Sequence, residues 1–541
     1  MPDTRVLRSL IVSSFYRSTL VRWMFVPVAL LTLSACGGSS SGSSGDASEI
    51  TGQPPETVQP SVTNVAIENA QPLLLVDDTL QLTANVETVG GATQKVTWSS
   101  SNPNVADVNA DGVVTAKALG TVTLTATSEF DQAIAAALEV SVVGSWTASI
   151  LQEDSGAIGF GNLVDVRIAV GNQGHMAVTG TTVNDFDGKG VPNPSTTTID
   201  GTTYTFFGFD GFVIVFDALG NELWRTQIRG NDSKTRTTAS VIHQDYVVVS
   251  DDERTIYVFA LLEEKTLQEF VLPPGSAVNT LVIGPNGALI AGGKSGNKAA
   301  VWVFEANPDG LWNDGPARHL LIADSNWNLT QAVQSSGGEF YGIVSQGTKA
   351  QMGTFRLLAD SFDSQLLLDP LHNVSNPVGR QRFAVSNSEH VVTVHKVYNS
   401  DFDPDSHDAY KYANLRVDAL GDMTVSSLWE DGPADNQSND TETSINGVAF
   451  TLDGNIIVAG GTDNALTTND ELASDTTWQG SNNGYIRIFA ASDGSPIATY
   501  AKSYPVLALT VDATGRIVTF EHNGDDRQHE LRVYRPDDLL D

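Results

Sequence analysis

The sequence predicts an all-β protein with two folded parts: an N-terminal β-sandwich, then a β-propeller of about seven blades. Short segments rich in Val, Ile and Thr, separated by Gly, Asn and Asp, run through most of the chain and are typical of strands and turns. Similar strand–turn–strand units recur from residue 145 onward, which indicates a repeat architecture. A chain of 541 residues with 41% hydrophobic residues is also too long for one ordinary core.

The charge and the cysteine content narrow the function classes. Lys and Arg number 30 against 64 Asp and Glu, a formal net charge of −34. Such a surface repels phosphate backbones, so we expect no nucleic-acid partner. Cys36 is the single cysteine, so no intrachain disulfide can form and the stability must come from packing.

The N-terminus has the pattern of an export signal. An apolar run at 24–33 follows a segment with several Arg residues, and it is shorter than the roughly 20 residues that span a bilayer. It therefore fits the apolar region of a secretory signal. The run ends in the tetrapeptide LSAC, with Cys36 as its last residue. A plain secreted protein with a chance cysteine near its cleavage site is the alternative.

The LSAC tetrapeptide resembles the lipobox of bacterial lipoproteins. In that family the Cys sulfur takes a diacylglyceryl group, and cleavage makes the Cys the new N-terminus. The resemblance implies that residues 1–35 are a lipoprotein signal peptide and that Cys36 is the lipidation site. It also implies lipid anchoring at the bacterial outer membrane, on its periplasmic or cell-surface face. Residues 36–60, rich in Gly and Ser, are then a flexible linker with an r.m.s. span of about 27 Å.

Residues 61–143 predict a small sandwich. The segment Leu80–Val86 alternates apolar and polar residues, and Asp111-Gly112 is a hairpin signal. Four motifs, VTWSSSN, VADV, DGVVTA and GTVTLTA, occur in that order. They resemble the group-2 bacterial immunoglobulin-like domain, whose members are spacers or adhesive modules and not enzymes. Asp77 departs from that family, which usually has Gly there. We expect Trp98 to lie in the core.

Residues 145–541 predict the propeller. Each repeat reads strand, turn, strand, variable loop, strand, turn, strand, which is one four-stranded antiparallel blade. The last repeat ends before a fourth strand, so we expect Ser145–Gln152 to supply it and close the ring. Six or eight blades remain open as alternatives. The second strands of seven blades are expected near residues 175, 246, 288, 339, 390, 455 and 516.

The repeats resemble the bacterial β-propeller repeat known as SBBP. DALGNELW, starting at Asp217, matches that repeat's Asp-x-x-Gly-Asn-x-x-Trp element in full. DATGR, starting at Asp512, and TLDGN, starting at Thr451, match its other element in part. The resemblance implies an exported bacterial propeller and names no activity. We expect blade aromatics such as Trp224 and Trp302 to fill the cores between blades.

An acidic loop is the main candidate metal site. Its alternating carboxylates belong to Asp401, Asp403, Asp405 and Asp408, and carboxylate oxygens are the ligands that Ca²⁺ prefers. The loop lacks the Gly and Glu of an EF-hand. A solvated acidic loop is the plainer reading, and calcium binding is the sharper one.

The sequence favours binding over catalysis, although it leaves an enzyme open. The nine His residues show no metal-ligand spacing, and no Ser-His-Asp set can be assigned. We therefore expect a membrane-anchored exported lipoprotein that binds a protein or glycan through its propeller, with the immunoglobulin-like domain as spacer or adhesive module. The alternatives are a periplasmic scaffold for outer-membrane assembly and a propeller enzyme that acts on polysaccharide.

Overall fold

The computed structural model shows a chain built almost entirely from β-strands. Among the residues whose structure is described, no helix has the length and hydrophobicity to cross a membrane. These residues are 58–150, 164–182, 195–199, 202–206, 210–228, 235–252, 254–321, 328–334, 340–346, 349–357, 362–366, 383–386, 390–398, 410–421, 424–431, 444–451, 453–462, 484–502, 505–523, 528–535 and 538.

The first folded part is the predicted β-sandwich, made of three small sheets ordered β1-β4, β2-β9-β8-β5 and β3-β7-β6. Its core holds Leu82, Val114 and Leu124, with Trp98 packed against them from a half-buried position. The strands are β1 (Ser61–Glu68), β2 (Leu73–Leu75), β3 (Thr79–Gln81), β4 (Thr83–Val89), β5 (Val96–Ser100), β6 (Ala106–Val108), β7 (Val113–Ala116), β8 (Gly120–Ser128) and β9 (Ala135–Val143).

The alternating segment Leu80–Val86 forms strand as predicted, except at Leu82. The segment is divided between β3 and β4, which lie in different sheets. The buried Leu82 sits at the crossing point, where its amide donates to the carbonyl of Gly112 at 2.9 Å. A strand that changes sheets keeps its alternating pattern, so the pattern could not show the break.

Asp77 occupies the position where the resembled family usually has Gly. Its φ is +75°, in the left-handed region, and its amide donates to the carbonyl of Ala116 at 3.0 Å. Asp is among the few residues that tolerate this conformation, because its short polar side chain forms local hydrogen bonds. The turn is therefore kept despite the substitution.

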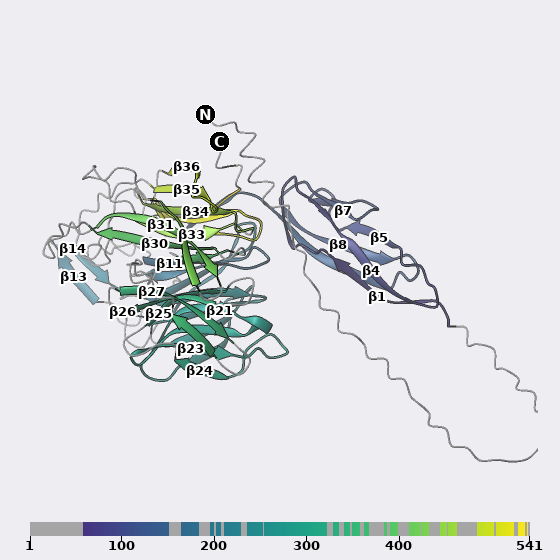
Figure 1. Ribbon diagram of the computed structural model, residues 1–541. Helices are drawn as coiled ribbons and strands as arrows, with labels where there is room; N and C mark the ends of the chain where they lie inside the picture. The colour runs from purple at the N-terminus through teal and green to yellow at the C-terminus, as the bar shows by residue number, and fades with distance from the viewer. Residues whose placement is uncertain are drawn as a thin grey trace, which may run out of the picture.

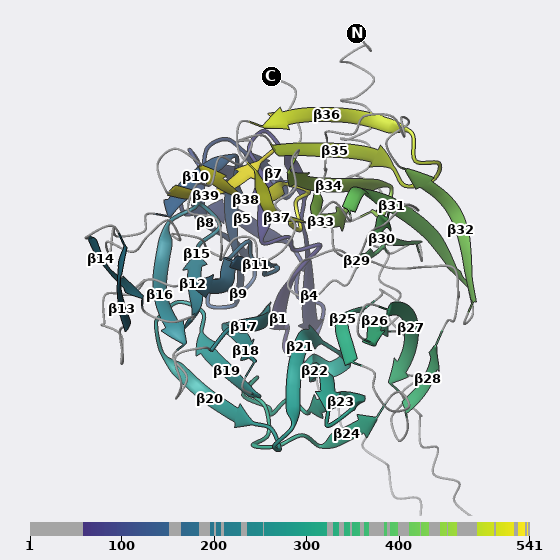
Figure 2. The ribbon, with the colours of Figure 1, turned by 90° about the vertical axis from the view of Figure 1, so that its left-hand side faces the viewer.

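The second part is a ring of seven four-stranded antiparallel sheets, which confirms the seven-blade prediction (Figure 2). Blades 1 to 3 are β11 (Val164–Val170), β12 (Met176–Thr182), β15 (Asp210–Phe216) and β16 (Glu222–Ile228); β17 (Thr237–His243), β18 (Tyr246–Asp251), β19 (Thr255–Ala260) and β20 (Thr266–Val271); and β21 (Ser276–Ile283), β22 (Leu289–Ser295), β23 (Lys298–Phe304) and β24 (Arg318–Leu321). An extra hairpin of β13 (Ser195–Ile199) and β14 (Thr202–Phe206) lies between β12 and β15.

The remaining blades follow the same order. Blades 4 to 6 are β25 (Asn328–Gln334), β26 (Phe340–Gln346), β27 (Lys349–Leu357) and β28 (Phe362–Leu366); β29 (Phe383–Val385), β30 (His390–Tyr398), β31 (Tyr410–Gly421) and β32 (Thr424–Asp431); and β33 (Ser444–Phe450), β34 (Ile456–Thr462), β35 (Gly484–Ala490) and β36 (Pro496–Lys502). Blade 7 has three late strands, β37 (Val506–Val511), β38 (Ile517–Asn523) and β39 (Gln528–Tyr534). All seven second strands begin within one residue of the predicted positions.

The fourth strand of blade 7 comes from the chain directly after the sandwich. This strand is β10 (Trp146–Ile150), which pairs antiparallel with β39 in register from Trp146↔Val533 to Ile150↔His529. The prediction that this segment closes the ring is confirmed. With β10 in place, blade 7 has four strands, as each of the other blades does.

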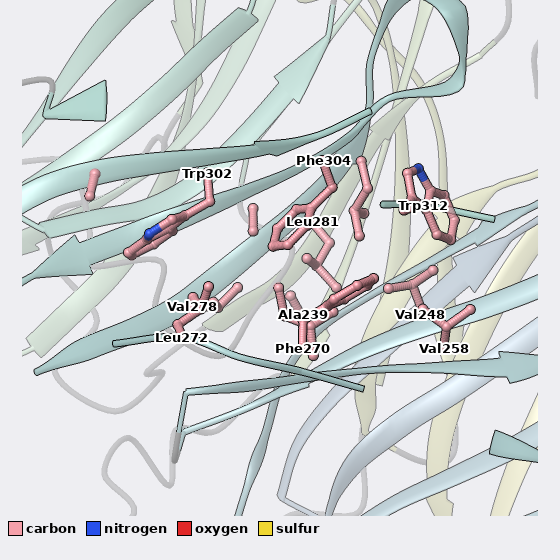
Figure 3. Close-up of a cluster of buried hydrophobic side chains, with 14 residues drawn as sticks. Ala239, Val248, Val258, Phe270, Leu272, Val278, Leu281, Trp302, Phe304 and Trp312 are labelled. Carbon is pink, nitrogen blue, oxygen red and sulfur yellow. The ribbon is translucent and has the colours of Figure 1, made fainter. Parts of the chain in front are cut away.

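The blades are held together by apolar side chains that fill the space between neighbouring sheets. Between blades 2 and 3, Val248 and Val258 lie with Phe270 on one side, and Phe304 and Trp312 on the other (Figure 3). The rings of Phe270 and Phe304 are 4.7 Å apart between centroids. Full burial of one such side chain stabilises a fold by about 2 kcal/mol.

The predicted places of two tryptophans in these inter-blade cores are confirmed. Trp224 is buried in the core shared by blades 1 and 2, and its indole N–H donates to the carbonyl of Leu261 at 2.9 Å. Trp302 is fully buried in the core between blades 2 and 3. Both side chains thus pack in the cores between blades.

Candidate binding face

The propeller has two unlike faces, which we name by the connections that reach them. In each blade, the strand ends joined from first to second strand lie at one face, here called the tight-turn face, as do those joined from third to fourth strand in blades 1 to 6. The strand ends joined from second to third strand, and from one blade to the next, lie at the other face, here called the long-loop face. Figure 2 looks onto the long-loop face, and the sandwich lies behind the ring.

The connections differ sharply in length between the two faces. Apart from residues 305–317, every connection on the tight-turn face has at most five residues. On the long-loop face, six connections exceed ten residues: 151–163, 183–209, 367–382, 399–409, 432–443 and 463–483. Loops on a rigid scaffold are the usual carriers of binding function, so this length difference marks the long-loop face as the candidate binding face.

On the tight-turn face, by contrast, aspartate side chains hold the turns in a fixed conformation. In the Asp217 turn, one carboxylate oxygen accepts from the amides of Leu219 and Asn221, each at 2.9 Å. In the Asp512 turn, the carboxylate accepts from the amides of Thr514 and Arg516 in the same way. Aspartate thus organises these turns, as the Asp-x-x-Gly pattern suggests.

Buried polar side chains of the propeller gather toward the long-loop face. In blade 1 they follow the apolar start of β12, since Met176 and Val178 are apolar while Thr181 and Thr182 are polar. Other buried polar side chains near strand ends on this face are Asp210, Thr237, Ser250, Asp251, Thr255, Ser276, Asn446, Glu521, His522 and His529. The strand ends on this face therefore carry most of the buried polar side chains of the propeller, whereas Ser386, Thr451, Asp512 and Arg516 are buried at tight turns.

The innermost strands are bent near the long-loop face by β-bulges. Six of the seven carry a register shift there, between Val164 and Arg167, Thr237 and Ala239, Val278 and Thr280, Leu329 and Gln331, Ile445 and Gly447, and Val506 and Ala508. A bulge adds one residue to one strand and re-aims its side chain. The recurrence shows that the bulge belongs to the repeat.

Side chains near the bulges bind neighbouring blades together. The side-chain amide of Asn279 donates to the backbone carbonyl of Leu329 at 2.9 Å. The side-chain amide of Asn446 donates to the backbone carbonyl of Val506 at 2.7 Å. Arg167 reaches the equivalent carbonyl of Thr237 at 3.1 Å. Burial lowers the pKa of Arg167. Each acceptor is the residue just before a bulge, so the same carbonyl is capped in three different blades.

A buried carboxylate lies between blades 6 and 7. Glu521 is 1% exposed, and its Oε1 accepts from Tyr534 at 2.8 Å and from Thr519 at 2.7 Å. Lys502 Nζ is 3.4 Å from the same oxygen, and Arg532 Nε is 3.5 Å from Oε2. Burial and the nearby carboxylate raise the pKa of Tyr534. Lys502 and Arg532 therefore place positive charge beside the buried carboxylate of Glu521.

Two histidines form a second buried polar group, on the opposite side of blade 7. His522 and His529 are cross-strand neighbours whose ring centroids are 4.7 Å apart. The ring of Phe520 lies 5.3 Å from that of His529. Burial lowers the pKa of His522 to about 4, so this ring is neutral at physiological pH.

The site residues predicted from the sequence lie outside the described part of the chain. This applies to Cys36 and to Asp401, Asp403, Asp405 and Asp408. Within the described part, no group of three or more His, Cys, Asp or Glu side chains is placed to hold a metal ion. Sequence reasoning did not find Glu521 or the histidine pair. The sequence of β38 alone does not indicate these groups, because the charged partners of Glu521 and the histidine beside His522 come from other strands.

Comparison with known proteins supports the fold of the sandwich. Residues 61–137 match the family model of the bacterial Ig-like domain (group 2). A stretch of 69 residues, 13% of this chain, is 41% identical to an alpha-L-arabinofuranosidase of Bifidobacterium longum subsp. longum. A stretch of 80 residues, 15% of this chain, is 36% identical to an uncharacterized protein of Clostridium acetobutylicum. The matches span only 6% and 8% of those relatives.

Solved structures with a similar arrangement are β-propellers. The Cps50 (Swd1) β-propeller domain of Myceliophteria thermophila covers 71% of this chain and 99% of its own, with a TM-score of 0.42 and 11% identity. The WD40 repeats of RRP9 cover 72% and 97%, with 0.43 and 10%. BamB from Moraxella catarrhalis covers 81% and 100%, with 0.37 and 12%. At such identities the likeness is one of fold alone.

The chain is thus an Ig-like domain of the bacterial group 2 joined to a β-propeller. This combination supports a binding or scaffold role.

The histidine pair predicts a pH dependence of stability. Because the pKa of His522 falls from 6.5 unfolded to about 4 folded, its contribution is complete above pH 6.5 and is lost as the pH falls toward 4. The wild type should lose about 3 kcal/mol more unfolding free energy between pH 7 and pH 4 than His522→Gln. Urea titrations followed by circular dichroism measure this. His319→Gln, at an exposed position, is the control. Equal losses in wild type and His522→Gln would contradict the prediction.

Proposed function

We propose that the protein is an exported lipoprotein, anchored to the bacterial outer membrane through Cys36, that binds a protein or glycan with the long-loop face of its propeller. The observation that carries the binding proposal is the asymmetry of the two faces. Of the seven propeller connections longer than ten residues, six join strand ends on one face, where most buried polar side chains of the propeller lie, while the other face has tight turns apart from residues 305–317. The Ig-like domain serves as a spacer between the anchor and the propeller.

The anchor rests on sequence alone: an apolar run, then LSAC, then a Gly- and Ser-rich segment. Two or more acyl chains hold a protein on a membrane stably, at about 0.8 kcal/mol for each buried CH₂. A Gly- and Ser-rich linker between Cys36 and residue 60 would let the folded part stand clear of the lipid.

Cys36→Ser should release the protein from the membrane, because it removes the sulfur that would carry the lipid. Fractionation of cells into membrane and soluble parts, followed by immunoblotting, measures the release. Ser34→Ala, which leaves the cysteine in place, should stay with the membrane. Retention of Cys36→Ser in the membrane fraction would contradict lipid anchoring.

The binding face can be tested by exchanging loops. A glycan array and a pull-down with the soluble chain first identify a ligand. Replacing residues 463–483 or 399–409 by a short Gly-Ser connection should then weaken capture at least tenfold. The matched control replaces the exposed residues 262–264 of a tight turn and should leave capture unchanged. Loss of capture in the control alone would place binding on the tight-turn face and contradict the proposal.

The alternatives are separated by two further outcomes of these experiments. Added protease should cleave a surface protein in intact cells, whereas a periplasmic assembly scaffold would be protected. A polysaccharide-acting enzyme would turn over the captured glycan instead of retaining it.

We also propose that this protein binds a calcium ion, because hard cations prefer carboxylate oxygens. The metal ligands would be Asp401, Asp403, Asp405 and Asp408. Chelator should lower the melting temperature of the full chain by several degrees, since a ligand that binds only the folded state stabilises it. Asp403→Asn with Asp405→Asn should abolish that difference. An unchanged melting temperature in the wild type would exclude the site.

A further inference from the structure

The connection between the two folded parts is very short. Only Gly144 and Ser145 separate β9 of the sandwich from β10 of the propeller. The carbonyl of Gly144 accepts a hydrogen bond from Arg516 Nη1 at 2.9 Å. The hydroxyl of Ser145 accepts from the amide of Arg535 at 2.7 Å and donates to the carboxylate of Asp538. Both connecting residues are therefore fixed by side chains or backbone of the propeller's last segment.

An apolar contact lies beside this connection. Leu73 and Val143 of the sandwich and Ala218 of blade 1 form one buried cluster. The contact leaves no spare room, because a Cβ on Gly174 would lie 2.9 Å from both Leu73 Cδ2 and Ala218 Cβ. The sandwich thus packs directly on two tight turns of blade 1, and Leu73 belongs to this contact, not to the sandwich's main core.

Trp146, the first residue of β10, seals the other side of the contact. Its indole N–H donates to the carbonyl of Ala218 at 3.2 Å. A Cβ on Gly220 would lie 2.6 Å from the indole ring, and the φ of Gly220 is +90°. Only glycine satisfies both conditions, so this turn of blade 1 is shaped to receive Trp146.

A buried arginine joins the three parts. Arg516, in a tight turn of blade 7, is fully buried and pairs with Asp512 at 2.7 Å between Nε and Oδ2. Its Nη1 reaches the carbonyl of Gly144 and, at 3.4 Å, that of Ala218. One guanidinium therefore contacts blade 7, the interdomain connection and blade 1. Its planar set of donors suits this task in a way that a lysine ammonium does not.

We infer that the Ig-like domain is docked rigidly on the tight-turn face at blades 1 and 7, as a stiff stalk that points the long-loop face away from the tether. The chain enters the sandwich at its far end, where Ser61 pairs with Val89, whereas Leu73 and Val143 lie at the propeller end. Figure 1 shows the sandwich extending from one side of the propeller, with the β13–β14 hairpin at the opposite side.

The inference assigns the accessible side for a partner. The tight-turn face of blades 1 and 7 is covered by the sandwich, and a protein or glycan partner would approach from the side opposite the tether. The choice of the long-loop face as the binding face rests on the proposed function, whereas the rigidity of the stalk does not. A flexible connection would instead require a longer linker and an exposed, unpacked junction.

The stalk can be tested by the distance between two spin labels in the soluble, ligand-free chain. Cys36→Ser removes the natural thiol, and Ala137→Cys on β9 and Glu263→Cys on blade 2 add exposed label sites. We expect one narrow distance distribution. Leu73→Asp should at least double its width, because it places a charge in the buried contact. Leu321→Asp, at an exposed leucine, should leave the width unchanged.

A second variant keeps the inference falsifiable if Leu73→Asp fails to fold. Insertion of ten Gly-Ser residues between Gly144 and Ser145 lengthens the connection and alters neither domain. It should also broaden the distribution at least twofold. A wild-type distribution as broad as that of the insertion variant would overturn the rigid stalk. Because the experiment uses neither membrane nor ligand, that result would leave the proposed anchor and binding face standing.

Discussion

The pairing of β10 with β39 is the interaction on which the rest of the molecule depends. It joins the start of the propeller to its end and turns seven sheets into a closed ring. Without it, blade 7 would have three strands, and the hydrogen-bonding groups of β10 and of the facing side of β39 would be unpaired and open to unwanted pairing. Ile150 of β10 is also fully buried in the core shared by blades 7 and 1, so the same strand supplies both hydrogen bonds and apolar contact.

The position of the sandwich follows from this closure. Since β10 is held at the rim of blade 7, and only two residues precede it, the end of β9 must lie at the tight-turn face. Arg516 and the Leu73 contact then remove the remaining freedom. Most buried polar side chains of the propeller lie toward the opposite face, so the contact with the sandwich and the candidate binding face are kept apart.

Periodicity made much of the fold predictable. The second strands, the closing strand and the two inter-blade tryptophans could be placed because they repeat a local pattern. The break at Leu82 could not, because alternation continues across a change of sheet. Arg516 fits its turn motif as an ordinary residue, yet its partners Gly144 and Ala218 are distant in sequence. Glu521 has the same character, since Lys502 and Arg532 reach it from other strands.

The order in which the chain is made gives ring closure a further consequence. The strand β10 is synthesised before any complete blade, whereas its partner β39 comes last. All strand pairings of the sandwich lie within residues 61–143, so it can fold early, but β10 must wait with its hydrogen-bonding groups unpaired until the final segment arrives. Long-range pairing of this kind is slow and exposes edges during folding. A chain truncated before β39 would therefore leave strands unpaired in two places: at its new C-terminal end and at β10, near the start of the propeller.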